Sequence, residues 1–196
     1  MKNLIKIFLV GMLLIGSTIS CSDSELSIDE LYDSVNTNGA FIRTIEKPLD
    51  LVNVSDPEKN RIEALIEIQE GNGSSQPDFK EVRMYIQTFQ DQDQIEPSLD
   101  TSGNPTGESF LATFPAADFT PSVTNGLPST NLSVLTQTVL DNNPNTVFTF
   151  PTFIFIRLEL EMNDGTIYTN TSVGPSVASG NYFLASFFYN IIFLPN

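Results

Sequence analysis

Histidine and tryptophan are absent from the 196-residue sequence, and cysteine occurs once, as Cys21. Without histidine, serine–histidine triads, cysteine–histidine dyads and histidine-ligated zinc or copper sites are ruled out in their usual forms. A single cysteine permits neither an internal disulfide nor a set of thiolate metal ligands. No glycine-rich phosphate loop lies between a strand and a helix. We therefore expect a protein that is not an enzyme.

Basic residues are also scarce. The chain has 9 Lys and Arg against 24 Asp and Glu, which gives a formal net charge of −15. An acidic surface repels the phosphates of nucleic acids and the head groups of anionic lipids. The composition therefore disfavours nucleic-acid binding, and attachment to a membrane would have to come from lipid rather than from charge.

The first 21 residues have the parts of a secretory signal. Lys2 and Lys6 form a basic start, an apolar run extends from Ile7 to Ile15, and small residues precede Cys21. The run is too short to cross a bilayer, which needs about 20 apolar residues. We predict that residues 1–20 are a lipoprotein signal peptide. The surroundings of Cys21 resemble a lipobox, which predicts acylation of Cys21 by fatty acids such as palmitate and stable anchoring.

Residues 21–38 are polar and acidic, and we interpret them as a tether. The segment 22–25 (Ser-Asp-Ser-Glu) resembles the surface-export signal of Bacteroidota lipoproteins, although an ordinary acidic tether would look similar. Residues 27–30 match a helix capping box, so this segment forms one or two helical turns or is disordered. Ser34 lies in an Asp-Ser-Val motif that resembles an O-glycosylation site of exported Bacteroidota proteins.

From residue 39 onwards the pattern is typical of β-strands. Polar and apolar residues alternate in 60–69, 79–89 and 153–162, with the period of two that half-buried strands show. Further strands are predicted at 40–45, 110–114, 130–134, 166–171 and 182–194, whereas 135–140 could be strand or helix. The loop at 71–75 predicts a hairpin between 60–69 and 79–89, and Asn163-Asp164-Gly165 predicts another after 153–162.

Strands without alternating helices predict one all-β domain over residues 39–196. We expect an antiparallel β-sandwich of the immunoglobulin or fibronectin type III kind. Two small sandwiches divided near residue 115 are the alternative, but each half would be short of strands.

The long loop 90–108 concentrates acidic side chains. Its candidate calcium ligands are Asp91, Asp93, Glu96 and Asp100, because calcium takes about 6–8 oxygen ligands from such loops. A solvated acidic loop is the simpler interpretation, and apart from calcium we expect no cofactor.

The aromatic residues are 15 Phe and 5 Tyr. We expect Tyr85 and Tyr168 at the surface, where they could contact a ligand. In the closing strand we expect Phe183, Phe187 and Phe188 to pack in the core or between the sheets.

Several segments together resemble one family: 39–45, 82–89, the turn at 126–128, 155–160 with 164–166, and 187–189. They are similar to small surface lipoproteins encoded beside TonB-dependent glycan-uptake systems of Bacteroidota, the starch-utilisation-type (SusE/SusF-like) accessory proteins. The resemblance implies an immunoglobulin-like domain on the exterior of the outer membrane. It implies a non-catalytic accessory of glycan or nutrient binding and uptake, with a TonB-dependent transporter, its surface lipoprotein and a glycan as partners. The alternative is a structural or adhesive module with protein partners only.

Overall fold

The structure is a computed structural model that describes residues 39–172 and 187–195, and all of these belong to one compact unit. The predicted signal peptide (1–20) and tether (21–38), with the lipidation site Cys21 and the glycosylation site Ser34, lie outside the described residues, as does Phe183. Within the described ranges, no helix is both long and apolar enough to traverse a bilayer.

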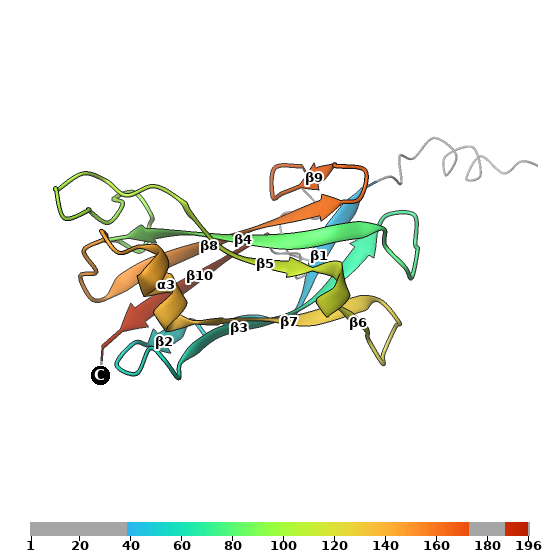
Figure 1. The fold of residues 1–196 in the computed structure, drawn as a ribbon, viewed down its shortest axis with the longest axis horizontal. Helices are drawn as coiled ribbons and strands as arrows, with labels where there is room; N and C mark the ends of the chain where they lie inside the picture. The colour runs from blue at the N-terminus through green and yellow to red at the C-terminus, as the bar shows by residue number, and fades with distance from the viewer. Residues whose placement is uncertain (1–38, 173–186, 196) are drawn as a thin grey trace, which may run out of the picture. The chain divides into compact units, whose positions relative to one another are not determined.

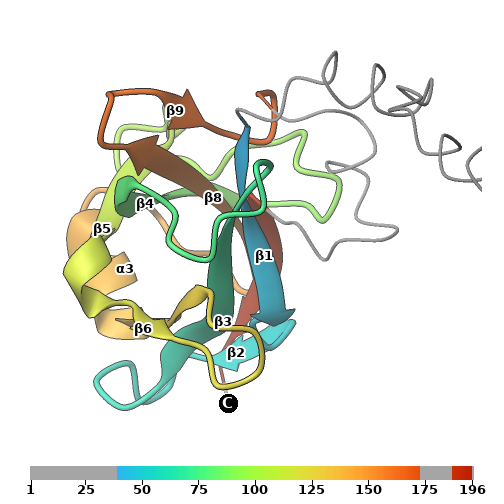
Figure 2. The same cartoon turned by 90° about the vertical axis from the view of Figure 1, so that its right-hand side faces the viewer.

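Two β-sheets pack face to face, which confirms the predicted all-β sandwich (Figures 1 and 2). Sheet A has the strand order β1-β3-β7-β6. Its strands are β1 (Ala40–Glu46), β3 (Arg61–Glu70), β7 (Pro128–Leu135) and β6 (Thr120–Pro121). Sheet B has the order β2-β10-β8-β4-β5. Its strands are β2 (Leu51–Asn53), β10 (Phe188–Leu194), β8 (Thr152–Met162), β4 (Phe79–Phe89) and β5 (Ser109–Pro115), with β9 (Ile167–Tyr168) paired to β8.

The alternation in the sequence correctly identifies the buried faces. In β8 every second side chain is buried over the whole strand, and in β3 the predicted inward residues from Ile62 to Ile68 are buried. The two inner faces form one hydrophobic core whose largest fully buried side chains include Phe187, Phe193, Met84, Leu132 and Ile154. Removing each such side chain from water contributes about 1.5–3 kcal/mol.

The predicted hairpin between residues 60–69 and 79–89 is wrong. β3 belongs to sheet A and β4 to sheet B, so the loop after Glu70 crosses from one sheet to the other. Each strand has one apolar face. That face is buried equally well whether the two strands are neighbours in one sheet or lie opposite each other across the core. The second predicted hairpin is confirmed: β9 pairs antiparallel with the end of β8, and Gly165 in the turn has a φ of 87°.

Sheet B is mixed, not purely antiparallel as predicted. β10 pairs antiparallel with β8 but parallel with the short strand β2. Two flanking backbone hydrogen bonds extend the parallel pairing, from Ile192 N–H to the Asp50 carbonyl (2.8 Å) and from Val54 N–H to the Leu194 carbonyl (3.0 Å). β10 is therefore an inner strand that is held on both sides.

The ambiguous segment after β7 forms a helix, α3 (Thr136–Asn142), and a 3-10 turn, η1 (Ala116–Asp118), follows β5. The Asn142 side chain donates to the backbone carbonyl of Leu111 in β5 (3.3 Å). β5 is an edge strand, and an edge with open backbone groups can pair with another chain. Asn142 thus occupies part of that edge.

Candidate functional site

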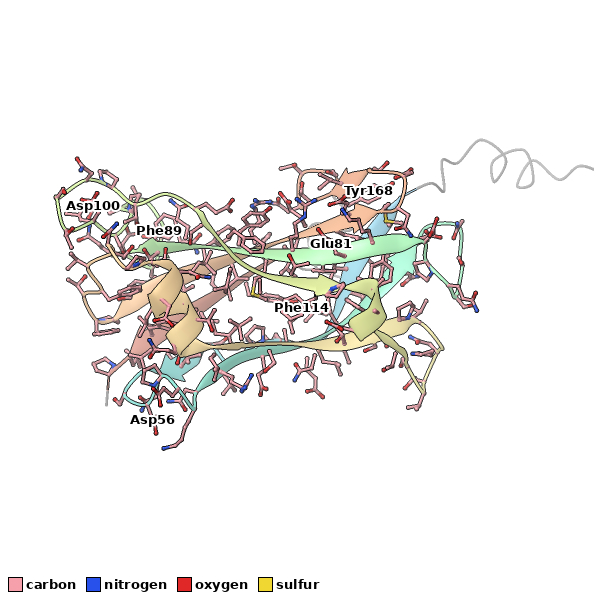
Figure 3. All side chains as sticks on the ribbon, in the orientation of Figure 1. Asp56, Glu81, Phe89, Asp100, Phe114 and Tyr168 are labelled. Atoms are coloured by element: carbon pink, nitrogen blue, oxygen red, sulfur yellow. The ribbon has the colours of Figure 1, made fainter. Side chains whose placement is uncertain are left out.

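The structure does not bring together the four candidate calcium ligands, Asp91, Asp93, Glu96 and Asp100. No group of three or more acidic side chains in the described ranges is arranged to hold a metal ion. The Asp91 carboxylate instead accepts the backbone N–H groups of Ile95 (3.1 Å) and Glu96 (2.6 Å). The Asp100 carboxylate accepts the backbone N–H of Asn104 (2.9 Å). These bonds lower the pKa of both aspartates, and they hold the loop beyond β4, in which Figure 3 labels Asp100.

The outward side of sheet B carries a row of large side chains that crosses four strands in register. Tyr85 of β4 is paired with Phe110 of β5 on one side and with Arg157 of β8 on the other. Arg157 is in turn paired with Phe188 of β10. Because side chains in register on neighbouring strands stand side by side, the row is continuous.

A second row lies two residues further along three of these strands, β4, β8 and β10. Phe155 of β8 is paired with Gln87 of β4 and with Asn190 of β10. Neither amide side chain has a hydrogen-bond partner among residues 39–172 and 187–195. We call the two rows the aromatic face: Tyr85, Gln87, Phe110, Phe155, Arg157, Phe188 and Asn190.

Among the rings of the aromatic face, exposure is greatest at the two ends of the first row. Phe110 is 50% exposed and Phe188 is 38% exposed. The prediction that Phe188 packs in the core is wrong, because adjacent strand residues point to opposite sides and its neighbour Phe187 takes the inward position at 1% exposure. The predicted surface position of Tyr85 is confirmed, since Tyr85 stands on the outer side between two buried neighbours.

Contacts between the rings hold the aromatic face in place. The ring centroids of Tyr85 and Phe110 are 5.7 Å apart in an edge-to-face arrangement. Those of Phe155 and Phe188 are also 5.7 Å apart, with the rings tilted. The Arg157 guanidinium carbon lies 4.5 Å from the centroid of Tyr85, over its ring. Such pairs favour fixed side-chain positions.

Arg157 is fixed further by two carboxylates. Its Nε and Nη2 atoms each donate to one oxygen of Glu108 at 2.7 Å. Its Nη1 donates to Glu159 at 2.7 Å. The hydrogen bonds to Glu108 and Glu159 raise the pKa of Arg157. A carboxylate has about four acceptor positions, so both glutamates can still accept hydrogen bonds from a ligand.

An ion-pair network continues along the same outer side of sheet B, beyond the aromatic face. Arg83 contacts Glu81, Glu159 and Glu161, and Lys80 contacts Glu161 at 2.8 Å. The bonds from Lys80 and the charge of Arg83 lower the pKa of Glu161. Glu81 of β4 is in register with Glu161 of β8, so the two side chains stand on the same side of sheet B. The cations on this side are thus already neutralised by glutamates.

The other cations of the described residues also have partners, although the partner of Arg61 is a neutral hydroxyl. Lys47 and Lys59 pair with aspartates, Arg43 pairs with Glu67, and Arg61 donates to the hydroxyl of Ser133. Every Lys and Arg that the structure describes therefore has a partner, and no cluster of free cations is present in these ranges.

A hollow of about 600 Å³ lies between η1 and the turn before β7. Its walls are mainly apolar and include Pro77, Phe79 and Phe119, and no charged side chain of the described part lines it. The amide of Asn125, which also lines it, donates to Glu67 at 2.9 Å. The hollow therefore offers few free polar groups that could orient a ligand, and the aromatic face is the better candidate.

No model of a known protein family matches this chain, and no curated protein matches it significantly. The function is therefore inferred from the chemistry of the aromatic face and from the sequence.

Proposed function

We propose that this protein is a non-catalytic accessory of glycan or nutrient binding and uptake, anchored by lipid on Cys21 to the outer membrane and facing the exterior. The observation that carries the proposal is the aromatic face on the outer side of sheet B. This face combines exposed rings and unpaired amides, and the carboxylates of Glu108 and Glu159 are held beside it by Arg157.

These groups match the two kinds of surface that a sugar offers. The C–H face of a pyranose ring packs against aromatic rings, and Phe110 and Phe188 are the most exposed rings of the aromatic face. The sugar hydroxyl groups need donors and acceptors, which the amides of Gln87 and Asn190 and the carboxylate of Glu108 can supply. Because the rings and Glu108 are already held by their contacts, ordering them on binding would cost little side-chain entropy.

The order of the strands supports an immunoglobulin-like topology. An immunoglobulin constant-type domain has strands A-B-E-D in one sheet and C-F-G in the other. Here β1-β3-β7-β6 takes the places of A-B-E-D, and β4-β8-β10 takes those of C-F-G. This topology is the one that the resemblance to starch-utilisation-type accessory lipoproteins implies.

The lipid anchor is tested by metabolic labelling with radioactive or alkyne-tagged palmitate. We expect the wild-type protein to be labelled, retained in the outer membrane and cleaved by protease added to intact cells. The variant Cys21→Ser should lose the label and the membrane retention. An unlabelled, full-length wild-type protein in the cytosol would refute the anchor.

Glycan binding is tested with the detergent-solubilised mature protein and a panel of polysaccharides, by affinity electrophoresis and calorimetry. The double variant Phe110→Ala/Phe188→Ala should bind at least about tenfold more weakly, since one lost ring contact of about 1 kcal/mol reduces affinity several-fold. Leu49→Ala is the matched control, because Leu49 is 76% exposed but lies outside the aromatic face. If no polysaccharide binds, or if both variants bind equally, the proposal is wrong.

A second function is favoured by one observation: the aromatic face is rich in Phe, Tyr and Arg, the residue types that are enriched at protein interfaces. An adhesive or structural module with protein partners only would use the same surface. A pull-down from solubilised outer membranes separates the two. Co-purification of TonB-dependent transporter subunits supports the accessory role, whereas a protein partner without transporter and without glycan affinity supports the adhesive one.

A further inference from the structure

We propose that the aromatic face accepts uncharged glycans and rejects acidic ones, such as polysaccharides that carry uronate or sulfate groups. This inference rests on the proposed function, because it names the class of glycan for the same site.

The first reason is the state of Arg157, the cation within the aromatic face. A planar guanidinium usually binds an anionic ligand through a pair of parallel hydrogen bonds to its carboxylate or phosphate. In Arg157 that pair is already formed with the two oxygens of Glu108 at 2.7 Å. A third N–H group donates to Glu159. An acidic sugar would have to displace one of these glutamates.

The second reason is the charge around Arg157. The outer side of sheet B carries the carboxylates of Glu81, Glu108, Glu159 and Glu161, and their cationic partners are Lys80, Arg83 and Arg157. Among these described residues the carboxylates outnumber the cations by one, in a chain of net charge −15. An approaching anion meets repulsion that no free cation offsets.

The third reason is the distribution of the remaining cations. Arg43 and Arg61 belong to strands of sheet A, and Lys59 lies in the loop after β2. Lys47 lines a hollow together with Phe188 and Asn190, but the carboxylate of Asp50 lies in the same hollow and binds Lys47. All four cations are engaged, by Glu67, Ser133, Asp56 and Asp50 respectively. Within the described part of the chain, therefore, no Lys or Arg is left for an acidic group of a ligand bound at the aromatic face. The unpaired amides of Gln87 and Asn190, by contrast, suit neutral hydroxyl groups.

The test compares neutral polysaccharides with their own acidic derivatives, so that only the charge differs. The probes are amylose, dextran, laminarin and hydroxyethyl cellulose, each with its carboxymethylated form, and the protein is the detergent-solubilised mature chain. At about 20 mM salt, we expect the carboxymethylated form of any bound polysaccharide to bind at least about tenfold more weakly than its neutral parent. This difference in affinity should shrink at about 500 mM salt, where charges are screened beyond about 4–5 Å.

Charge variants assign the effect to the aromatic face. Glu108→Gln removes one negative charge and releases the paired N–H groups of Arg157, so the ratio of acidic to neutral affinity should rise by about threefold or more. The matched control is Glu63→Gln, which removes the same charge from β3 in sheet A and should leave the ratio unchanged. Circular dichroism and a thermal scan establish that both variants are folded.

The outcomes separate the two proposals. If an acidic derivative binds as tightly as its neutral parent, or if Glu108→Gln leaves the ratio unchanged, the charge selectivity is wrong while glycan binding survives. If none of the eight polysaccharides binds, glycan binding itself fails and the selectivity fails with it.

Discussion

The hydroxyl oxygens of Thr44 in β1 and Tyr189 in β10 lie 2.8 Å apart inside the core. Thr44 is 3% exposed and Tyr189 is 7% exposed, so neither hydroxyl can turn to water for a partner. Their hydrogen bond joins sheet A to sheet B, and buried polar groups that lose such a partner destabilise a fold.

The variant Tyr189→Phe should lower the free energy of unfolding by about 1–3 kcal/mol, because it leaves the Thr44 hydroxyl buried without a partner. Urea denaturation followed by tyrosine fluorescence or circular dichroism measures the change. Thr44→Val completes a double-mutant cycle, in which the double variant should lose less stability than the sum of the single variants. Additive losses would mean that the hydrogen bond contributes nothing.

Alkaline pH provides an independent check on Tyr189. Burial raises its pKa to about 12, against the opposing effect of the bond with Thr44. In the unfolded chain a tyrosine loses its proton near pH 10, so between about pH 10 and 12 the folded state holds a proton that the unfolded state has released. The free energy of unfolding should therefore fall by about 1.4 kcal/mol per pH unit in that window. Tyr189→Phe should lack this component, and an identical alkaline loss in both proteins would contradict the assignment.

Arg157 should contribute more stability than an exposed cation does. Arg157→Met removes the two bonds to Glu108, the bond to Glu159 and the contact with Tyr85. We expect a loss of about 1–3 kcal/mol in urea denaturation. The control Lys59→Met breaks an ion pair with Asp56 in which Lys59 is 80% exposed, and it should cost less than about 0.5 kcal/mol. Equal losses would show that the aromatic face gains no rigidity from Arg157.

The loop after β4 should depend on Asp91 rather than on calcium. Asp91→Ala removes the carboxylate that accepts two backbone N–H groups, so limited proteolysis should cut the loop faster. Asp93→Ala is the matched control and should leave the cleavage rate unchanged. Added calcium at about 1 mM, a level that fills even weak extracellular sites, should not raise the melting temperature. A clear increase would reinstate the calcium site.

The sequence predicts the strands well but predicts their pairing less well. Alternation over β4 and β8 identifies both the limits of the strands and their buried faces, because burial of one face imposes a period of two. The same alternation cannot distinguish a hairpin from a crossover between sheets. The predicted hairpin between β3 and β4 is wrong for this reason. β2 is only three residues long and gains its order from β10, so its own sequence carries little signal.

The aromatic face could likewise be predicted from the sequence only in part. Tyr85 could be placed at the surface, since its neighbours in β4 alternate clearly. Phe187 and Phe188 are adjacent and chemically identical, so only the register with β8 determines which of them points outward. The row from Phe110 to Phe188 exists because four strands that are separated in the sequence align, and this information is not local.

The position of β10 has a consequence for biosynthesis. In a nascent chain that has not yet emerged beyond Phe188, the position between β2 and β8 is empty, because β10 pairs with both strands. β2 then has no partner strand, and β8 is paired on one side only. Sheet B can be complete only after Leu194 has left the ribosome. Until then the polypeptide remains short of its native fold, and this would suit the export that we propose, because secretion channels take unfolded chains.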